Sequence, residues 1–280
     1  RGYSDAFASR DFVVIDALTN TYHFTDPNNC ANTTGQFGGT TERWTRRGYG
    51  DYCGSFISPG YRTIRNGKDS VQGYSYATFD LNDSTSLYGE LMLNYEEVEY
   101  ATGSNYTWWG TGLKYGAFYD PDIGRLVNLQ RSFAPEDIGG LGYRDIMNTD
   151  RNKAYSLAFG VEGVLGNSNW DYDVGVMRTE YKLTERGWNR WADPIDQYFR
   201  DTVLGPELGV DPVYNFYPVF RPDYAAFYSP ISPEDFAGFT GFTTTESRTW
   251  NNLFRAQFTN ASLFDLPGGS AGFAVVAEAG

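Results

Sequence analysis

The sequence has 280 residues, a net charge of −13 and a pI near 4.5. This acidic balance argues against nucleic acid as a partner, since binding to phosphates needs a basic surface. Aromatic residues make up 18% of the chain and charged residues 20%, with 32 glycines, a composition that favours strands and turns over a helical enzyme. No stretch of the sequence approaches the roughly 18 apolar residues that a membrane-spanning helix requires.

Alternation of apolar and polar residues predicts the strands. In the segment 71–81, Ala77, Phe79 and Leu81 share one face, and polar residues occupy the other. After a polar turn at 82–85, the same alternation resumes. The pattern recurs along the chain, and we predict strands near residues 7–16, 71–81, 86–96, 153–165, 170–180, 249–264 and 271–280.

The connections between the predicted strands fall into two classes of length. Turns of four or five residues join the strands within each hairpin, whereas long segments join one hairpin to the next, at 17–70, 97–152 and 182–248. Strands of about ten residues with short turns on one side and long loops on the other are typical of outer-membrane β-barrels. A soluble β-sandwich would show the same alternation, so alternation alone does not decide.

We therefore predict an all-β fold in which residues 1–280 are part of one antiparallel transmembrane β-barrel domain in the bacterial outer membrane. The short turns would be periplasmic and the long loops extracellular, with outer-membrane lipid around the strands. Seven strands cannot close such a barrel, and an open edge in lipid leaves costly unpaired backbone groups. We expect further strands outside this sequence.

Several segments resemble the central barrel of TonB-dependent receptors. They are 74–91, 118–129, 163–176 and 266–274, each combining aromatic-rich alternation with Asn, Asp and Gly turns. The resemblance is one of texture across most of the chain. It implies a barrel of about twenty-two strands around an N-terminal plug. It also implies import of a scarce ligand, with energy supplied by a TonB complex through parts that we expect outside this sequence, namely the TonB box and the plug.

Sequence patterns that imitate enzyme sites do not hold up. The run 268–272 matches the Gly-x-Ser-x-Gly nucleophile elbow, but it lies between two predicted strands and no histidine follows it. His23 is the single histidine, too few for a usual zinc site. Asp120 begins half of a calcium loop without its closing Glu. We predict no catalytic residues, no metal site and no cofactor.

Aromatic residues in the long loops are the best candidates for ligand contact. Their faces and edges suit a small molecule, an oligosaccharide or a peptide. The alternative is that they only pack the loops together. The candidates are Trp108, Trp109, Trp188, Trp191, Tyr214, Phe216, Tyr217 and Phe220.

The two cysteines, Cys30 and Cys53, lie close in sequence within a polar stretch, so we predict a loop disulfide and an oxidising compartment. Two free thiols are the alternative. Together these features predict a receptor and transporter rather than an enzyme. The competing interpretations are a passive porin-like channel and a secreted, soluble all-β binding protein.

Overall fold

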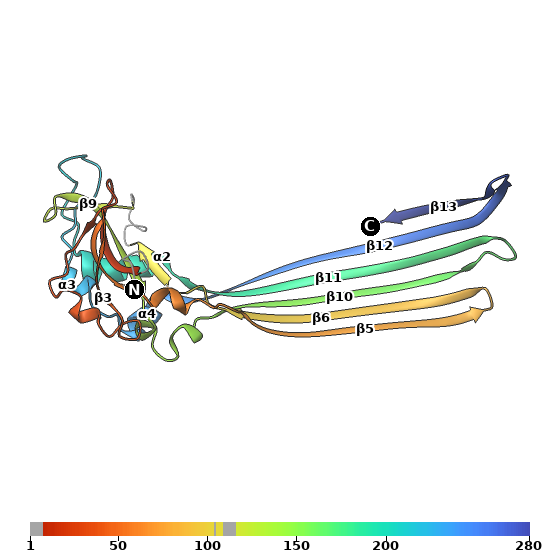
Figure 1. Ribbon diagram of the computed structural model, residues 1–280, viewed down its shortest axis with the longest axis horizontal. Coiled ribbons are helices and arrows are strands. Elements are labelled where there is room, and N and C mark those ends of the chain that lie inside the picture. Colours follow the sequence, from red (N-terminus) through yellow and green to blue (C-terminus); the bar gives the residue numbers. More distant parts are fainter. Residues whose placement is uncertain (1–7, 104, 109–115) are drawn as a thin grey trace. The chain divides into compact units, whose positions relative to one another are not determined.

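The computed structural model describes residues 8–103, 105–108 and 116–280, most of them in antiparallel strands (Figure 1). The chain divides into two compact units. Unit 1 comprises Arg1–Asn66, Tyr100–Asn148 and Gly187–Thr243, and unit 2 comprises Gly67–Glu99, Thr149–Arg186 and Thr244–Gly280. The prediction that residues 1–280 are part of one barrel domain stays a prediction, since this division does not test it. Among the described residues, no helix is long and apolar enough to cross a membrane.

Unit 2 holds the central stretches of a six-stranded sheet with the order β13-β12-β11-β10-β6-β5. Figure 1 shows the three tight turns together at one end of these strands. The strands are β5 (Gly67–Asn82), β6 (Thr85–Tyr100), β10 (Asn148–Val164), β11 (Trp170–Arg190), β12 (Thr240–Leu266) and β13 (Gly269–Ala279).

The six predicted strands of these hairpins are confirmed, and most extend well beyond the predicted limits. The antiparallel register explains why the alternation was informative. It sets Phe79 opposite Leu87 and Phe159 opposite Val176, so apolar side chains gather on the same face of each hairpin. A shift by one residue would move every apolar side chain to the other face.

Unit 1 contains a sheet of seven strands in the order β3-β4-β1-β9-β7, with β2 beside β1 and β8 beside β9. The strand predicted near 7–16 is present as β1 (Ser9–Asp16), and it lies inside this sheet rather than beside the long hairpins. The other strands are β2 (Tyr22–His23), β3 (Glu42–Arg46), β4 (Gly50–Ser55), β7 (Asn105–Trp108), β8 (Phe118–Asp120) and β9 (Arg125–Phe133).

Short helices complete unit 1. They are η1 (Ala31–Thr33), η2 (Ser58–Tyr61), α1 (Pro135–Ile138), η3 (Gly142–Arg144), α2 (Ala192–Phe199), η4 (Arg200–Leu204), α3 (Tyr224–Phe227) and α4 (Pro233–Gly238). The segments 17–70, 97–152 and 182–248, predicted as long loops, thus contribute most of a folded unit. Their aromatic residues explain why, because Phe133, Phe227, Phe236 and Phe239 form a buried core with β1.

The predicted disulfide is confirmed. Cys30 and Cys53 are bonded with their Cα atoms 5.8 Å apart, and both are buried in the core of unit 1. Cys53 lies in β4, whereas Cys30 precedes η1, so the bond ties an irregular segment to the sheet. A bridge that closes a loop of this size stabilises a fold by about 3 kcal/mol in the chain-entropy account.

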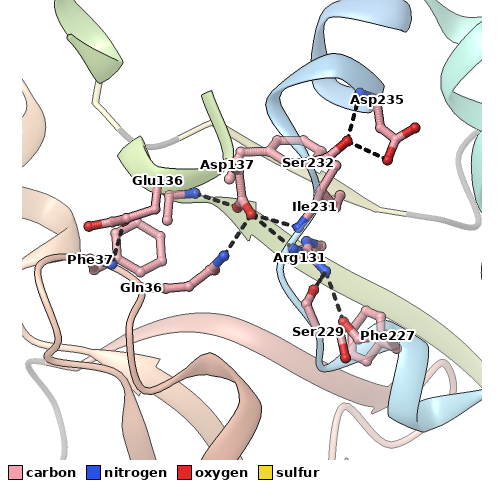
Figure 2. Close-up of polar contacts among 12 residues, drawn as sticks. Gln36, Phe37, Arg131, Glu136, Asp137, Phe227, Ser229, Ile231, Ser232 and Asp235 are labelled. Carbon is pink, nitrogen blue, oxygen red and sulfur yellow. Dashed lines mark hydrogen bonds and ion pairs between the residues drawn. The ribbon is translucent and has the colours of Figure 1, made fainter. Parts of the chain in front are cut away.

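Unit 1 contains a buried ion pair (Figure 2). Arg131 of β9 and Asp137 of α1 are both almost fully buried, with 3.4 Å between the guanidinium and the carboxylate. The Arg131 guanidinium also donates to the carbonyl oxygens of Phe227, at 3.0 Å, and Ser229, at 2.6 Å. Burial lowers the pKa of Arg131, and the neighbouring Asp137 carboxylate opposes that effect.

Asp137 extends this network to the remaining segment of unit 1. Its carboxylate accepts hydrogen bonds from the Gln36 side chain at 2.6 Å, from the backbone N–H of Ile231 at 2.8 Å and from that of Ala134 at 2.9 Å (Figure 2). Gln36, Ala134 and Ile231 belong to three different chain segments of unit 1. The ion pair therefore joins all three segments, which lie far apart in the sequence.

Replacing the buried Arg131 should lower the free energy of unfolding of unit 1. In Arg131→Met, the Asp137 carboxylate stays buried without its cation, and loss of one partner of such a pair costs about 3–5 kcal/mol. Denaturant unfolding followed by near-UV circular dichroism measures this loss. Arg125→Met is the matched control, since Arg125 is exposed on the same strand. Equal destabilisation by the two variants would contradict a central role for the ion pair.

Candidate functional site

Two of the predicted ligand-contact residues belong to the core of unit 1. The Trp188 ring stacks on Phe236 with 5.4 Å between ring centroids and an interplanar angle of 10°. Phe220 is 2% exposed and meets Phe118 edge to face. Both residues thus have the packing role that was the alternative, and the predicted ligand contact stays a prediction.

The other candidate tryptophans are described in part. Trp108 ends β7, where its backbone pairs with Gln130, and Trp109 lies outside the described residues. Trp191 directly precedes α2 and donates its backbone N–H to the carbonyl of Phe239 at 2.8 Å. Its side chain is partly exposed.

The remaining candidates lie together on one loop, residues 208–219, which we call the aromatic finger. Its base is closed by backbone hydrogen bonds, with the N–H of Leu208 donating to Val219 at 2.8 Å and that of Val219 donating to Gly209 at 2.9 Å. Farther out, the N–H of Asp211 donates to Tyr217 at 2.8 Å. The finger thus resembles a narrow hairpin.

A buried carboxylate holds the end of the aromatic finger in shape. Asp211 accepts hydrogen bonds from the backbone N–H groups of Val213, Tyr214, Phe216 and Tyr217. Burial disfavours the charge on Asp211, yet these backbone donors outweigh burial and lower the pKa to about 2. The sequence contained a signal for this role, because Asp followed by Pro favours a turn capped by the Asp side chain.

This turn presents apolar side chains outward. Tyr217 lies between two neighbours, meeting Tyr214 and Phe216 edge to face at centroid distances of 5.9 and 5.2 Å. The exposed apolar residues of the finger are Leu208, Val210, Val213, Tyr214 and Phe216. Such a surface binds by apolar and aromatic contact, so it suits recognition.

One face of the sheet of unit 2 has an exposed apolar region, and Arg178 and Glu180 form an ion pair farther along β11 on the same face. Phe79, Phe159, Val176 and Phe254 are between 46% and 67% exposed. A Cβ atom added to Gly89 would lie 3.2 Å from the Phe159 ring, which places β6 and β10 side by side on this face. The apolar surface therefore continues across neighbouring hairpins.

The opposite face of this sheet carries polar and charged side chains. Tyr88 donates its hydroxyl to Asp173 at 2.9 Å, and its ring occupies space that Gly160 and Gly175 leave open. A Cβ atom at Gly160 would overlap the Tyr88 ring. Ion pairs on the sheet include that between Lys68 and Glu96, at 2.5 Å.

Patterns with possible enzyme or metal chemistry have structural roles. The run 268–272 forms the turn and first residues of the β12–β13 hairpin. Among the described residues, one group of possible metal ligands gathers, Asp26 with Cys30 and Cys53, and the disulfide removes both thiols from it. His23 lies 3.8 Å from the carboxylate of Asp16.

The sequence patterns did not identify a buried acidic residue in β1, Asp11. Asp11 is fully buried, and its polar neighbours are the hydroxyls of Ser9, Ser58 and Ser132. Burial raises the pKa of Asp11 to about 7, against the smaller opposing effect of the serines.

Comparison with protein-family models, curated proteins and solved structures gives no match to this chain. Its functional interpretation therefore rests on the residues themselves.

Removing the Asp211 carboxylate should loosen the aromatic finger while the rest of unit 1 stays folded. In Asp211→Ala, the four backbone N–H groups lose their acceptor, and we expect their hydrogen exchange to accelerate by about tenfold or more. Exchange measured by mass spectrometry on peptides covering 208–219 tests this. Glu207→Ala, at an exposed neighbouring position, should leave the exchange unchanged. Unchanged exchange in Asp211→Ala would show that the carboxylate does not hold the finger.

Asp11 should make unit 1 less stable at alkaline pH. Its pKa is raised in the folded state, so the stabilising contribution of the protonated form is complete below about pH 4 and is lost as the pH rises through about 7. Asp11→Asn should therefore be more stable than the parent at pH 8, by up to about 4 kcal/mol, with little difference at pH 4. Denaturant unfolding at both pH values checks this. Glu42→Gln, exposed on β3, should retain the pH dependence of the parent. The same pH dependence in Asp11→Asn would exclude Asp11 as its source.

Proposed function

We propose that this chain is part of a TonB-dependent receptor of the bacterial outer membrane, which binds a scarce nutrient ligand at the cell surface and imports it. The observation that carries the proposal is the apolar, exposed face of the long-stranded sheet in unit 2. Outside a membrane, an apolar surface that spans several strands needs another protein to cover it. In a membrane, the hydrocarbon of the lipid covers such a surface, and no other protein is needed.

The dimensions of the sheet support a membrane location. A tilted strand of about ten residues crosses a bilayer. The strands β10, β11 and β12 have 17, 21 and 27 residues, long enough to cross and to extend beyond the lipid. The polar face, with the contact between Tyr88 and Asp173, suits a hydrated barrel interior.

The segments of unit 1 join the hairpins of unit 2 in the sequence, and each hairpin has its tight turn at the opposite end of its strands. In outer-membrane barrels, the long connections are extracellular. Unit 1 would then face the surroundings of the cell, where the disulfide between Cys30 and Cys53 persists. Its aromatic finger, which exposes apolar side chains and is held by hydrogen bonds to Asp211, is the part best suited to recognition.

Arginine substitutions on the two faces of β11 test the membrane location. Val176→Arg places a charge on the apolar face, where the cost at the bilayer midplane is about 2–4 kcal/mol. Met177→Arg, its neighbour on the polar face, is the matched control. We expect Val176→Arg to deplete the chain from the detergent-extractable outer-membrane fraction and Met177→Arg to leave it there. Extraction of the parent protein without detergent would support the secreted, soluble alternative.

Permeability separates an energy-coupled receptor from a passive channel. Proteoliposomes that hold the full-length protein should be nearly impermeable to a neutral sugar, because a plugged barrel has no open pore. A high permeability, measured by liposome swelling, would favour the porin-like alternative and overturn the receptor proposal.

A further inference from the structure

Two arginines of unit 1 converge on the hydroxyl of one tyrosine. Arg10 of β1 donates to the Tyr22 hydroxyl oxygen at 3.0 Å, and Arg46, the last residue of β3, donates to the same oxygen at 2.8 Å. A tyrosine hydroxyl is a neutral acceptor, so it brings the two cations together without balancing their charge. Two like charges are thus held close to each other on the sheet of unit 1.

Neither arginine has a carboxylate partner among the described residues. Carboxylates are plentiful, since the chain has 35 acidic and 22 basic residues, and Arg43 of β3 pairs with Asp51. Side chains alternate along β3, so Arg43 points to the face opposite to Arg46. Glu42 shares the face of Arg46 but forms no ion pair within the described part of the chain. The two guanidinium groups therefore remain a pair of cations.

Aromatic rings hold this pair in place. The Arg46 guanidinium lies 4.0 Å from the ring centroid of Tyr49, and that of Arg10 lies 5.9 Å from the ring centroid of Tyr22. Tyr22 is buried and meets Tyr52 edge to face, whereas both arginines are half-buried. The two guanidinium groups are thus positioned by the fold and still reachable from solvent. Binding through groups that are already ordered avoids much of the entropic cost of fixing them.

The three side chains offer hydrogen-bond donors that the described residues leave unused. Each guanidinium has five N–H donors and reaches Tyr22 through one nitrogen. The Tyr22 oxygen accepts from both arginines, so its own O–H stays available as a donor. Donors from Arg10, Arg46 and Tyr22 therefore meet around one point. An anion bound there would place negative charge between the two cations.

The charge of the pair indicates the class of anion. A carboxylate would balance one of the two cations, whereas a phosphate monoester carries a charge of about −1.5 to −2 at pH 7. The planar guanidinium group also matches the oxygens of phosphate. A polyanion such as nucleic acid would be repelled by a chain with a net charge of −13. A single phosphoryl group fits both the local charge and the charge of the whole chain.

We propose that Arg10, Arg46 and Tyr22 form a binding site for the phosphoryl group of a phosphomonoester. The two arginines supply the positive charge, and Tyr22 holds them together and donates its O–H. This inference concerns unit 1 alone and does not depend on where the sheet of unit 2 resides. It can therefore fail while the membrane proposal holds, and the reverse.

Protection of individual arginines from phenylglyoxal, which modifies guanidinium groups, tests the proposal on the full-length protein in detergent. Mass spectrometry follows the modification residue by residue, with inorganic phosphate, glucose 1-phosphate or acetate added and sodium chloride keeping the ionic strength constant. We expect both phosphates to slow the modification of Arg10 and Arg46 by about fivefold or more, and acetate to have a much smaller effect. Arg65 and Arg125, exposed elsewhere in unit 1, should react at unchanged rates.

Substitutions within the site supply a second readout. Arg46→Gln should abolish the protection of Arg10 by phosphate. Tyr22→Phe removes the shared hydroxyl and keeps the ring, and it should raise the phosphate concentration for half-protection by about tenfold. Arg125→Gln is the matched control and should leave this concentration unchanged.

Phosphatidic acid added to the detergent micelles separates a membrane source of the phosphoryl group from a soluble one. Protection by this lipid alone would support the phosphoryl site and assign its ligand to the membrane. Four outcomes would overturn the proposal. They are no protection of Arg10 and Arg46, equal protection of Arg65 and Arg125, protection by acetate as strong as by phosphate, and protection of Arg10 that persists in Arg46→Gln.

Discussion

The constraint on which the account depends is that a sheet with one apolar face must have that face covered. In unit 2, the register of each hairpin puts apolar residues opposite one another, as with Phe159 and Val176, and the side chains are nevertheless exposed. Because side chains alternate along a strand, Asp173 and its partner Tyr88 lie on the other face. A surface of this kind is stable in lipid or against another protein. The proposed membrane location follows from this requirement, and the interior of the proposed barrel follows from the polar face.

Unit 1 depends on a different interaction, because its three segments are separated in the sequence by the hairpins of unit 2. The pair of Arg131 and Asp137 lies where these segments meet, and its hydrogen bonds reach Gln36 in the first segment and Ile231 in the third. The disulfide between Cys30 and Cys53 acts only within the first segment. A buried ion pair of this kind favours one arrangement of the segments, because other arrangements would leave the charges unpaired. The aromatic finger is thus part of unit 1, which has a hydrophobic core of its own.

The sequence predicted the long hairpins well because alternation is a local signal that survives wherever one face is polar. A strand was also predicted at β1, but not the sheet to which it belongs, because Phe12, Val13, Val14 and Ile15 are all buried and burial on both faces removes the alternation. The pairing of β1 with β9 joins residues more than 100 positions apart, which no local pattern indicates. The sequence indicated which aromatic residues lie in the long connections, but composition could not separate buried Phe220 from exposed Phe216. The disulfide was predictable because two cysteines allow one pairing.

The most direct test of the proposed membrane location is to measure which face of the sheet in unit 2 contacts lipid. Nitroxide labels at successive positions of β12, from 254 to 258, would be examined by electron paramagnetic resonance in bilayers of the full-length protein. If the sheet faces lipid, labels at Phe254, Ala256 and Phe258 should be highly accessible to oxygen. Labels at Arg255 and Gln257 should be highly accessible to a water-soluble nickel reagent. Access of the nickel reagent to all five positions, or no alternation between them, would contradict a lipid-facing sheet and with it the proposed function.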